Sequence, residues 1–246
     1  FEVIVVDNAS KDGSAEFVRD KYGDKVRVVA NTENKGFSGG INDGVAASRG
    51  EFVVLLNPDA AFSRVDFDRL RAQFDDPEVG IVAPKIEWPN GEIQPSFGFF
   101  PTRLSLFLYF FKIARFLPKG FLVYNNIWNR KYYQNTSKVD WVSGCSFMIR
   151  RSFLDIIGGF DDAYFLYVED VDVCRRVARA KKSVFVDSDW VVSHILQASV
   201  KEDLAKNMEY QSEGFVRYFN IHEKKSVQRL MNLIYFLKKK KLPEQN

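Results

Sequence analysis

Two acidic segments of the sequence could do chemistry. The first is the turn Asn57-Pro58-Asp59, which follows the apolar run at residues 51–56. A carboxylate on a tight turn after a buried strand suits a divalent cation that also binds a phosphate, because Mg²⁺ and Mn²⁺ prefer hard oxygen ligands. Solvated turns use the same residue types, so a plain turn is the alternative interpretation.

The second acidic segment is Glu169-Asp170-Val171-Asp172, at the start of a predicted helix that continues to about residue 180. The helix macrodipole favours carboxylates at this end, so stabilisation of the helix is the alternative to a catalytic role. Asp172 can pair with Arg175 or Arg176, three and four residues further along. Asp170 is then the carboxylate that is free to take a proton from a hydroxyl group.

The elements that must position these residues alternate between strands and helices in the first half of the chain. Apolar runs predict strands at residues 2–6, 26–30, 51–56 and 79–83, with helices at 14–22, before 49–50 and at 64–74. This alternation predicts an α/β fold with a mostly parallel sheet flanked by helices. Ligands bind at the carboxyl ends of such strands, so Asp7, the loop 31–40 and the turn at Asp59 are expected to share one cleft.

The second half of the chain predicts fewer regular elements. Residues 97–138 are irregular, aromatic and basic, residues 141–150 form a strand, and helices are expected at about 201–220 and 226–241. A further strand at 183–187 ends shortly before His194. This position suits a metal or phosphate ligand, whereas a structural histidine is the alternative.

Composition excludes several classes of protein. The 246 residues are 46% hydrophobic and 27% charged, which is typical of a soluble globular chain. The net charge of +3 comes from a basic C-terminal segment, so the body offers no broad basic face for nucleic acid. Cys145 and Cys174 form no metal-binding pattern and are expected to be core thiols in a reducing compartment. No P-loop, nucleophile elbow or HExxH motif is present.

Taken together, the motifs resemble the family-2 inverting glycosyltransferases with the GT-A fold, particularly the rhamnosyltransferase-like branch. The matching strings are VIVVDNASKDGS (3–14), NTENKGFSGGINDGVAASRGEFVVLLNPDA (31–60), VDWVSGCSFMIRRSFLDIIGGFDDAYFLYVEDVDVCRRVARAKK (139–182) and VVSH (191–194). Their order and spacing make the resemblance specific, although each motif alone is weak.

The resemblance implies roles for particular residues. The residues implied to bind a dTDP- or UDP-sugar donor are Asp7, Asn8, Ser10, Gly36, Asn42, Asn57 and Asp59. The residues implied to line the acceptor side are Trp141, Ser143, Gly144 and Cys145. Asp170, with its neighbour Glu169, would be the catalytic base, and Asp59 and His194 would hold Mg²⁺ or Mn²⁺. Asn57 replaces the first Asp of the family's DxD motif, which is expected to weaken cation binding without abolishing it.

The resemblance also implies an organisation of the chain. Residues 1–95 would bind the nucleotide-sugar, 96–138 would be a variable insertion, 139–200 would form the acceptor-binding and catalytic half, and 201–246 would form helices with a basic tail. Family members carry a strand and a helix before the first strand seen here, so we expect an N-terminally truncated piece of a longer enzyme.

The expected reaction is inverting transfer of rhamnose or a similar hexose to a hydroxyl of a glycan or lipid-linked acceptor, in cell-surface polysaccharide synthesis. Residues 104–117 and 226–242 are apolar and basic, and are expected to contact the inner face of the plasma membrane from the cytoplasm. Helices packed on the domain are the alternative. The competing functions are a nucleotidyltransferase and a catalytically impaired nucleotide-binding fragment.

Overall fold

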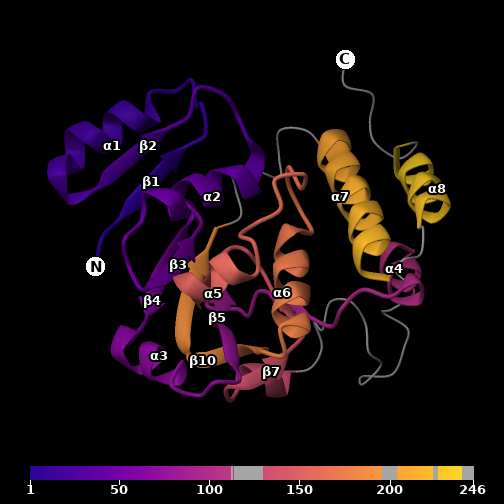
Figure 1. Ribbon diagram of the computed structural model, residues 1–246. Helices are drawn as coiled ribbons and strands as arrows, with labels where there is room; N and C mark the ends of the chain where they lie inside the picture. The colour runs from indigo at the N-terminus through magenta and orange to yellow at the C-terminus, as the bar shows by residue number, and fades with distance from the viewer. Residues whose placement is uncertain (112, 114–129, 196–203, 224–226, 240–246) are drawn as a thin grey trace.

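The structure is a computed structural model that describes residues 1–111, 113, 130–195, 204–223 and 227–239 (Figure 1). The end of the expected 104–117 segment and both ends of the 226–242 segment therefore lie outside the described residues.

Ten strands are formed by the described residues: β1 (Ile4–Asp7), β2 (Arg27–Ala30), β3 (Phe52–Leu56), β4 (Ala60–Arg64), β5 (Val79–Glu87), β6 (Phe97–Gly98), β7 (Ser137–Val139), β8 (Trp141–Val142), β9 (Ser146–Arg150) and β10 (Ser183–His194). The α-helices of the same residues are α1 (Ser14–Tyr22), α2 (Gly36–Ala47), α3 (Phe67–Gln73), α4 (Arg103–Phe110), α5 (Arg151–Ile156), α6 (Glu169–Arg179), α7 (Leu204–Tyr218) and α8 (Gln228–Lys239). A π-helical turn, Phe219–Glu223, continues α7.

The predicted α/β architecture with flanking helices is confirmed, but its central sheet is mixed rather than mostly parallel. The strand order is β3-β9-β5-β10-β4, with β7 also paired to β10. Only β5 and β10 pair in parallel, whereas β9 runs against β3 and β5, and β4 and β7 run against β10. The prediction missed β4, which follows β3 directly and runs against β10, and β9, which comes from the second half of the chain and enters between β3 and β5.

A second, smaller sheet consists of β1 and β2, which pair in parallel as the alternation predicted. Figure 1 shows α1 and α2 beside this pair. The turn after β1 and the loop after β2 therefore lie at the same end of the small sheet, because Asp7 pairs with Ala30 at the end of both strands.

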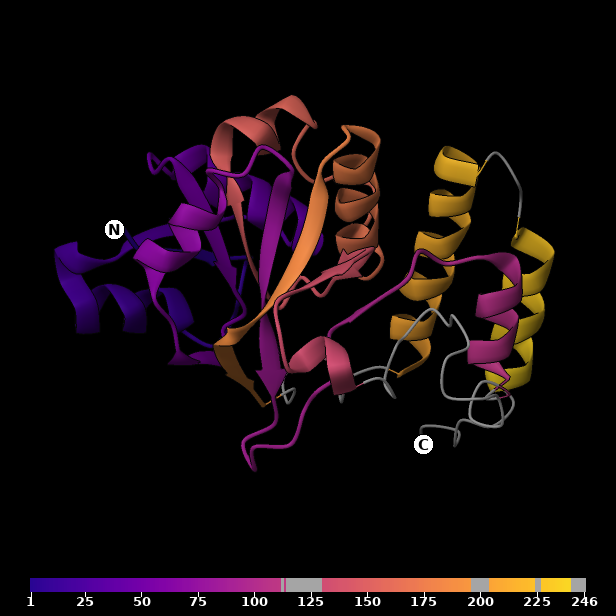
Figure 2. The same ribbon diagram turned by 90° about the horizontal axis from the view of Figure 1, so that it is seen from below.

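The main hydrophobic core lies between the sheet and α6. It contains Ile81 and Ile149 from the sheet, Val173 and Val177 from α6, and Phe215 from α7, all fully buried. Figure 2 shows α6 between the sheet and α7, with α4 and α8 on the far side of α7. The helix that carries the second acidic segment is thus covered on both sides.

Candidate active site

One short turn connects the two acidic segments. The predicted strand at 141–150 is in fact two strands, β8 and β9, separated by Ser143, Gly144 and Cys145. The N–H of Gly144 donates to Oδ2 of Asp170 over 3.1 Å. The next residue, Cys145, accepts a bond from the N–H of Asn57 over 2.9 Å. Adjacent residues of this turn therefore hold the Asn57–Asp59 turn and the start of α6 in one place.

Asp59 and His194 meet across the sheet edge. His194 is the last residue of β10, and its Nε2 lies 3.1 Å from Oδ1 of Asp59. Its Nδ1 lies 2.9 Å from Oε1 of Gln94, an amide oxygen that only accepts hydrogen bonds. Nδ1 therefore donates to Gln94, and Nε2 is the ring nitrogen that lies beside the Asp59 carboxylate.

Nε2 of His194 and Oδ1 of Asp59 are both electron-rich, so a positive charge stabilises their close approach. That charge is either a second proton on His194 or a cation bound to both atoms. One imidazole nitrogen and one carboxylate oxygen are also suitable ligands for a divalent cation such as Mn²⁺. Across the described parts of the chain, no cluster of three or more His, Cys, Asp or Glu residues could hold a metal ion. These two residues thus fit a cation whose other ligands come from outside the described protein side chains.

The carboxyls of Glu169 and Asp170 both have pKa values above their usual range. Burial raises the pKa of Asp170 to about 6, and the hydrogen bonds from Gly144 and Val171 work against this rise. Glu169 is 5% exposed, and burial together with the nearby Asp170 charge raises its pKa well above the usual range. Burial is the largest cause of both shifts, and the nearby Asp170 charge adds to the rise at Glu169. A carboxylate whose pKa lies near the working pH is suited to general-base chemistry.

The chain enters α6 through two residues with left-handed backbone conformation. Tyr167 has φ of 70° and Val168 has φ of 73°, and neither is a glycine. Each such residue costs on the order of 1–3 kcal/mol and persists where surrounding contacts enforce it. The strain lies directly before the Glu169–Asp170 pair, which is where functional constraints concentrate.

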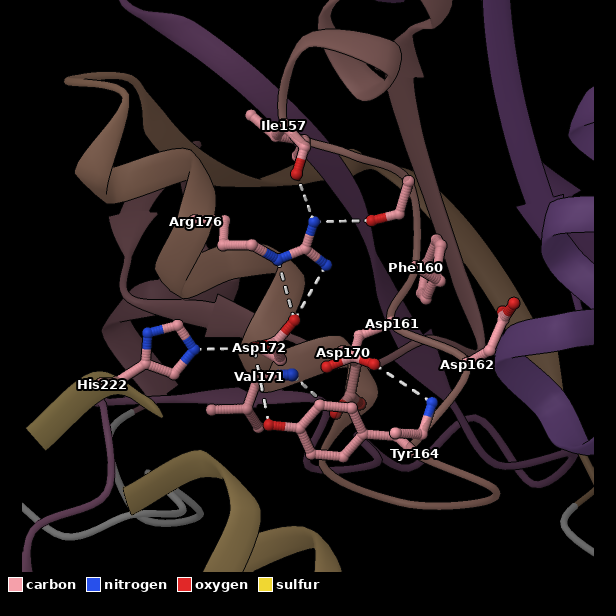
Figure 3. Close-up of polar contacts among 12 residues, drawn as sticks. Ile157, Phe160, Asp161, Asp162, Tyr164, Asp170, Val171, Asp172, Arg176 and His222 are labelled. Atoms are coloured by element: carbon pink, nitrogen blue, oxygen red, sulfur yellow. Dashed lines mark hydrogen bonds and ion pairs between the residues drawn. The ribbon is translucent and has the colours of Figure 1, made fainter. Parts of the chain in front are cut away.

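Asp172 is a buried structural carboxylate (Figure 3). It is 2% exposed; Nε of Arg176 donates to its Oδ2 over 2.8 Å, as the helical spacing predicted, and Nε2 of His222 lies 2.6 Å from its Oδ1. Burial disfavours its charge, yet His222 and Arg176 hold the pKa of Asp172 below its usual value. Asp170 has no such cationic partner among the described residues, in agreement with the prediction that it is the free carboxylate of the segment.

On the expected donor side, Asn8 organises the loop after β2. Its Nδ2 donates to the carbonyl of Gly36 over 2.8 Å, and its Oδ1 accepts from the N–H of Lys35. Gly36 has φ of 74°, and a Cβ there would lie 2.4 Å from the carbonyl oxygen of Phe165. Asp7 ends β1 beside this loop, and Ser10 lies exposed on the following turn. The loop is therefore shaped by Asn8 and by contact with the segment before α6.

Asn42 also contacts that segment. Its Nδ2 donates to the carbonyl of Phe160 over 2.8 Å and to Oδ1 of Asp162, and its Oδ1 accepts from the N–H of Phe160. These bonds connect α2 to the loop before α6. The role of Asn42 in donor binding stays a prediction, and the structure gives it a second role in holding the two halves of the domain together.

Three of the four expected acceptor-side residues, Trp141, Gly144 and Cys145, are buried. Trp141 is 6% exposed and donates from Nε1 to the carbonyl of Phe99, and Cys145 is 3% exposed. Burial raises the pKa of Cys145 to about 12, in line with a core thiol. Ser143 and Gly144 form the turn that faces Asp170. Acceptor contact by these residues stays a prediction.

Sequence reasoning missed several residues of the site. Gln94 sets the tautomer of His194 from 100 positions away, and His222 contacts Asp172 from 50 positions away. The only signal for His222 was that it is one of two histidines in the chain. Nothing in the local sequence marked Tyr167 and Val168 as left-handed.

The chain belongs to glycosyl transferase family 2, because the profile of that family matches residues 1–158. It is similar to the N-acetylglucosaminyl-diphospho-decaprenol L-rhamnosyltransferase of Mycobacterium tuberculosis, with 30% identity over 210 residues, 78% of this chain and 66% of that protein. It is also 26% identical to the low-salt glycan biosynthesis hexosyltransferase Agl10 of Haloferax volcanii over 193 residues, 72% of this chain and 53% of that protein. The chain thus spans about half to two thirds of the length of these relatives.

Solved structures share the fold, which is the GT-A fold of glycosyltransferases. GalNAc-T7 with UDP, GalNAc and Mn²⁺ superposes with a TM-score of 0.59 at 14% identity, covering 94% of this chain and 48% of that one. The mannosyltransferase PcManGT from Pyrobaculum calidifontis, in complex with GDP-Man and Mn²⁺, gives 0.57 at 19% identity, covering 95% and 59%. The resemblance to family-2 rhamnosyltransferases with the GT-A fold is therefore confirmed.

Proposed function

We propose that this chain is the catalytic part of an inverting glycosyltransferase that moves rhamnose or a similar hexose from a dTDP- or UDP-sugar to a hydroxyl of a lipid-linked acceptor or glycan. The observation that carries the proposal is the 143–145 turn, whose Gly144 binds Asp170 while Cys145 binds the Asn57–Asp59 turn. This turn links Asp59, the proposed cation ligand, to Asp170, the proposed base.

The proposed chemistry is a single displacement. The acceptor hydroxyl gives its proton to Asp170 as its oxygen attacks the anomeric carbon, and the bond from that carbon to the nucleoside diphosphate breaks. Burial and the neighbouring Asp170 charge raise the pKa of Glu169, since like charges this close disfavour each other. Asp170 is held in place for this role by the N–H groups of Gly144 and Val171.

Asp59 and His194 would hold the divalent cation, Mg²⁺ or Mn²⁺, which would stabilise charge on the departing diphosphate. The support is the donor set described above, in which Nε2 of His194 lies beside the Asp59 carboxylate. Asn57, on the same turn, is proposed to lie nearer the ribose or sugar. Asp7, Asn8, Ser10, Gly36 and Asn42 keep their proposed place on the nucleotide side.

The acceptor is proposed to be lipid-linked, because one relative is named for a diphospho-decaprenol acceptor. None of the described helices is long and apolar enough to cross a membrane. Of the sixteen exposed large apolar side chains among the described residues, six lie on or beside α4 and α8: Leu104, Phe107, Phe111, Leu233, Phe236 and Leu237. Neither helix contains an acidic residue.

Peripheral contact with an anionic leaflet on the cytoplasmic side suits this surface. Flotation with anionic vesicles tests the contact. Phe236→Ser should reduce the bound fraction, and Phe17→Ser, at an exposed phenylalanine on α1, should not. Equal binding of both variants to the vesicles would contradict the proposed membrane contact.

Calorimetric titration tests the nucleotide part of the proposal. UDP or dTDP should bind more tightly with Mn²⁺ than without it, and a donor-hydrolysis screen should then identify the sugar. A preference for nucleoside triphosphates would favour a nucleotidyltransferase instead, and no binding would favour an impaired fragment. The domain limits 1–95, 96–138, 139–200 and 201–246 remain part of the proposal.

A further inference from the structure

The helical segment Leu204–Glu223 is attached to α6 and to the loop before it by several polar contacts. Arg217 donates from Nη2 to Oδ2 of Asp161 over 2.6 Å, and Arg175 donates to Oε1 of Glu223 over 2.8 Å. The His222 carbonyl accepts a bond from Arg179 over 3.0 Å. These contacts all lie beyond residue 158, where the match to the family profile ends.

The segment also touches the strained entry to α6. A Cβ built on Gly214 would lie 2.9 Å from the carbonyl oxygen of Tyr167 and 3.0 Å from Cγ2 of Val168. The backbone of α7 therefore packs directly against the two left-handed residues that precede Glu169. Such a conformation persists only where its surroundings enforce it, and α7 forms one wall of those surroundings.

A further contact reaches Asp172, near the start of α6 (Figure 3). His222 is 8% exposed, and its Nε2 lies 2.6 Å from Oδ1 of Asp172. On the other side, Arg176 binds Oδ2 of Asp172 and the carbonyls of Ile157 and Gly159. Asp172 lies two residues after Asp170 on the same helix, so a shift of Asp172 moves Asp170 as well.

We propose that the segment Leu204–Glu223 is a positioning element for the catalytic base, and that it acts through His222 and Gly214. Gly214 supports the turn before Asp170, and His222 holds Asp172 after it. Between these points the Asp170 carboxylate is kept within hydrogen-bond distance of the N–H of Gly144. The inference rests on the proposed base role of Asp170, but the position of its carboxylate can be measured without any sugar transfer.

Hydrogen exchange followed by NMR tests the position directly. The N–H groups of Gly144 and Val171 both donate to Asp170 and should be protected in the native protein. His222→Ala and Gly214→Ala should each speed their exchange by about tenfold or more, while the N–H of Ile149 in the central sheet stays protected. Asn220→Ala, an exposed neighbour in the same π-helical turn, is the matched control and should change neither.

Kinetics separates positioning from a general loss of structure. His222→Ala and Gly214→Ala should lower kcat by about 10-fold to 100-fold with little change in the donor KM, because small misplacement of a base slows the chemical step. His222→Gln, which keeps a donor to Asp172, should retain most of the activity. Unchanged exchange at Gly144 and Val171, or equal loss of protection at Ile149, would overturn the proposal. If exchange at Gly144 and Val171 changes in the variants but the native protein transfers no sugar, the proposed function is contradicted and the positioning role is not.

Discussion

Asp170→Asn should abolish sugar transfer and, at the same time, stabilise the protein above about pH 6. Burial raises the pKa of Asp170 from 3.8 to about 6. Below pH 3.8 the carboxyl is protonated in both the folded and the unfolded chain. Between pH 3.8 and about pH 6, the unfolded chain loses this proton while the folded chain keeps it, so the free energy of unfolding falls as the pH rises. The full loss of stability is present above about pH 6.

The size of the loss follows from the shift. About two pKa units correspond to about 3 kcal/mol of unfolding free energy. Asparagine carries no charge, so the substitution removes this destabilisation. Its single amide oxygen replaces two carboxylate oxygens and accepts only one of the two bonds from the N–H groups of Gly144 and Val171, which costs about 1 kcal/mol. The variant should therefore gain about 1–2 kcal/mol near pH 8, or about 2–8 °C in Tm for a chain of this size.

Urea unfolding at about pH 4 and about pH 8 measures the effect. Asp170→Asn should gain stability only at the higher pH, while nucleotide binding persists and kcat falls by about 10²-fold or more. Asp172→Asn is the matched control, because this buried carboxylate has cationic partners and should lose about 3–5 kcal/mol. Destabilisation of Asp170→Asn by the same amount at both pH values would contradict a raised pKa of Asp170 in the folded protein.

Three further outcomes are expected. Asp59→Ala should remove the Mn²⁺ dependence of UDP binding measured by calorimetry, and a dependence equal to that of the native protein would count against the cation site. Asn42→Ala should lower the unfolding free energy by about 1–3 kcal/mol in urea, because the N–H and carbonyl of Phe160 lose their partner; a loss under about 0.5 kcal/mol would show that water replaces it. Cys145 and Cys174 should react with a thiol reagent only on unfolding, since burial raises the pKa of both thiols, and rapid reaction of the folded protein would contradict their burial.

Patterns within one helix or one strand were readable from the sequence. The pairing of Asp172 with Arg176 followed from helical spacing, and the α1 limits Ser14–Tyr22 followed from the flanking turn residues. These predictions depend on interactions between residues a few positions apart, which the order of residues determines directly.

Contacts between distant segments were not readable in the same way. The direction of β9 depends on where the chain re-enters the sheet, and the run 141–150 looks like one strand although Gly144 interrupts it. The interruption has a packing reason, since a Cβ on Gly144 would lie 3.0 Å from Phe37 and 3.6 Å from Asp170. Both neighbours are remote in sequence, so no local pattern contains them.

The site shows the same division. Asp59, Asp170 and His194 were selected by residue type and by the resemblance to the family. Their supports, Gln94 and His222, are ordinary residues whose importance comes from the partner that each one contacts. A single sequence contains no signal for such pairs until the fold brings them together.

The proposed cation site is tested by the position of manganese in crystals of this protein grown with UDP and Mn²⁺, measured by anomalous diffraction. We expect a peak bound to Oδ1 of Asp59 and Nε2 of His194, with the diphosphate on the side that faces the Gly144–Asp170 contact. A manganese peak away from both residues, or UDP bound on another face of the molecule, would contradict the proposed site.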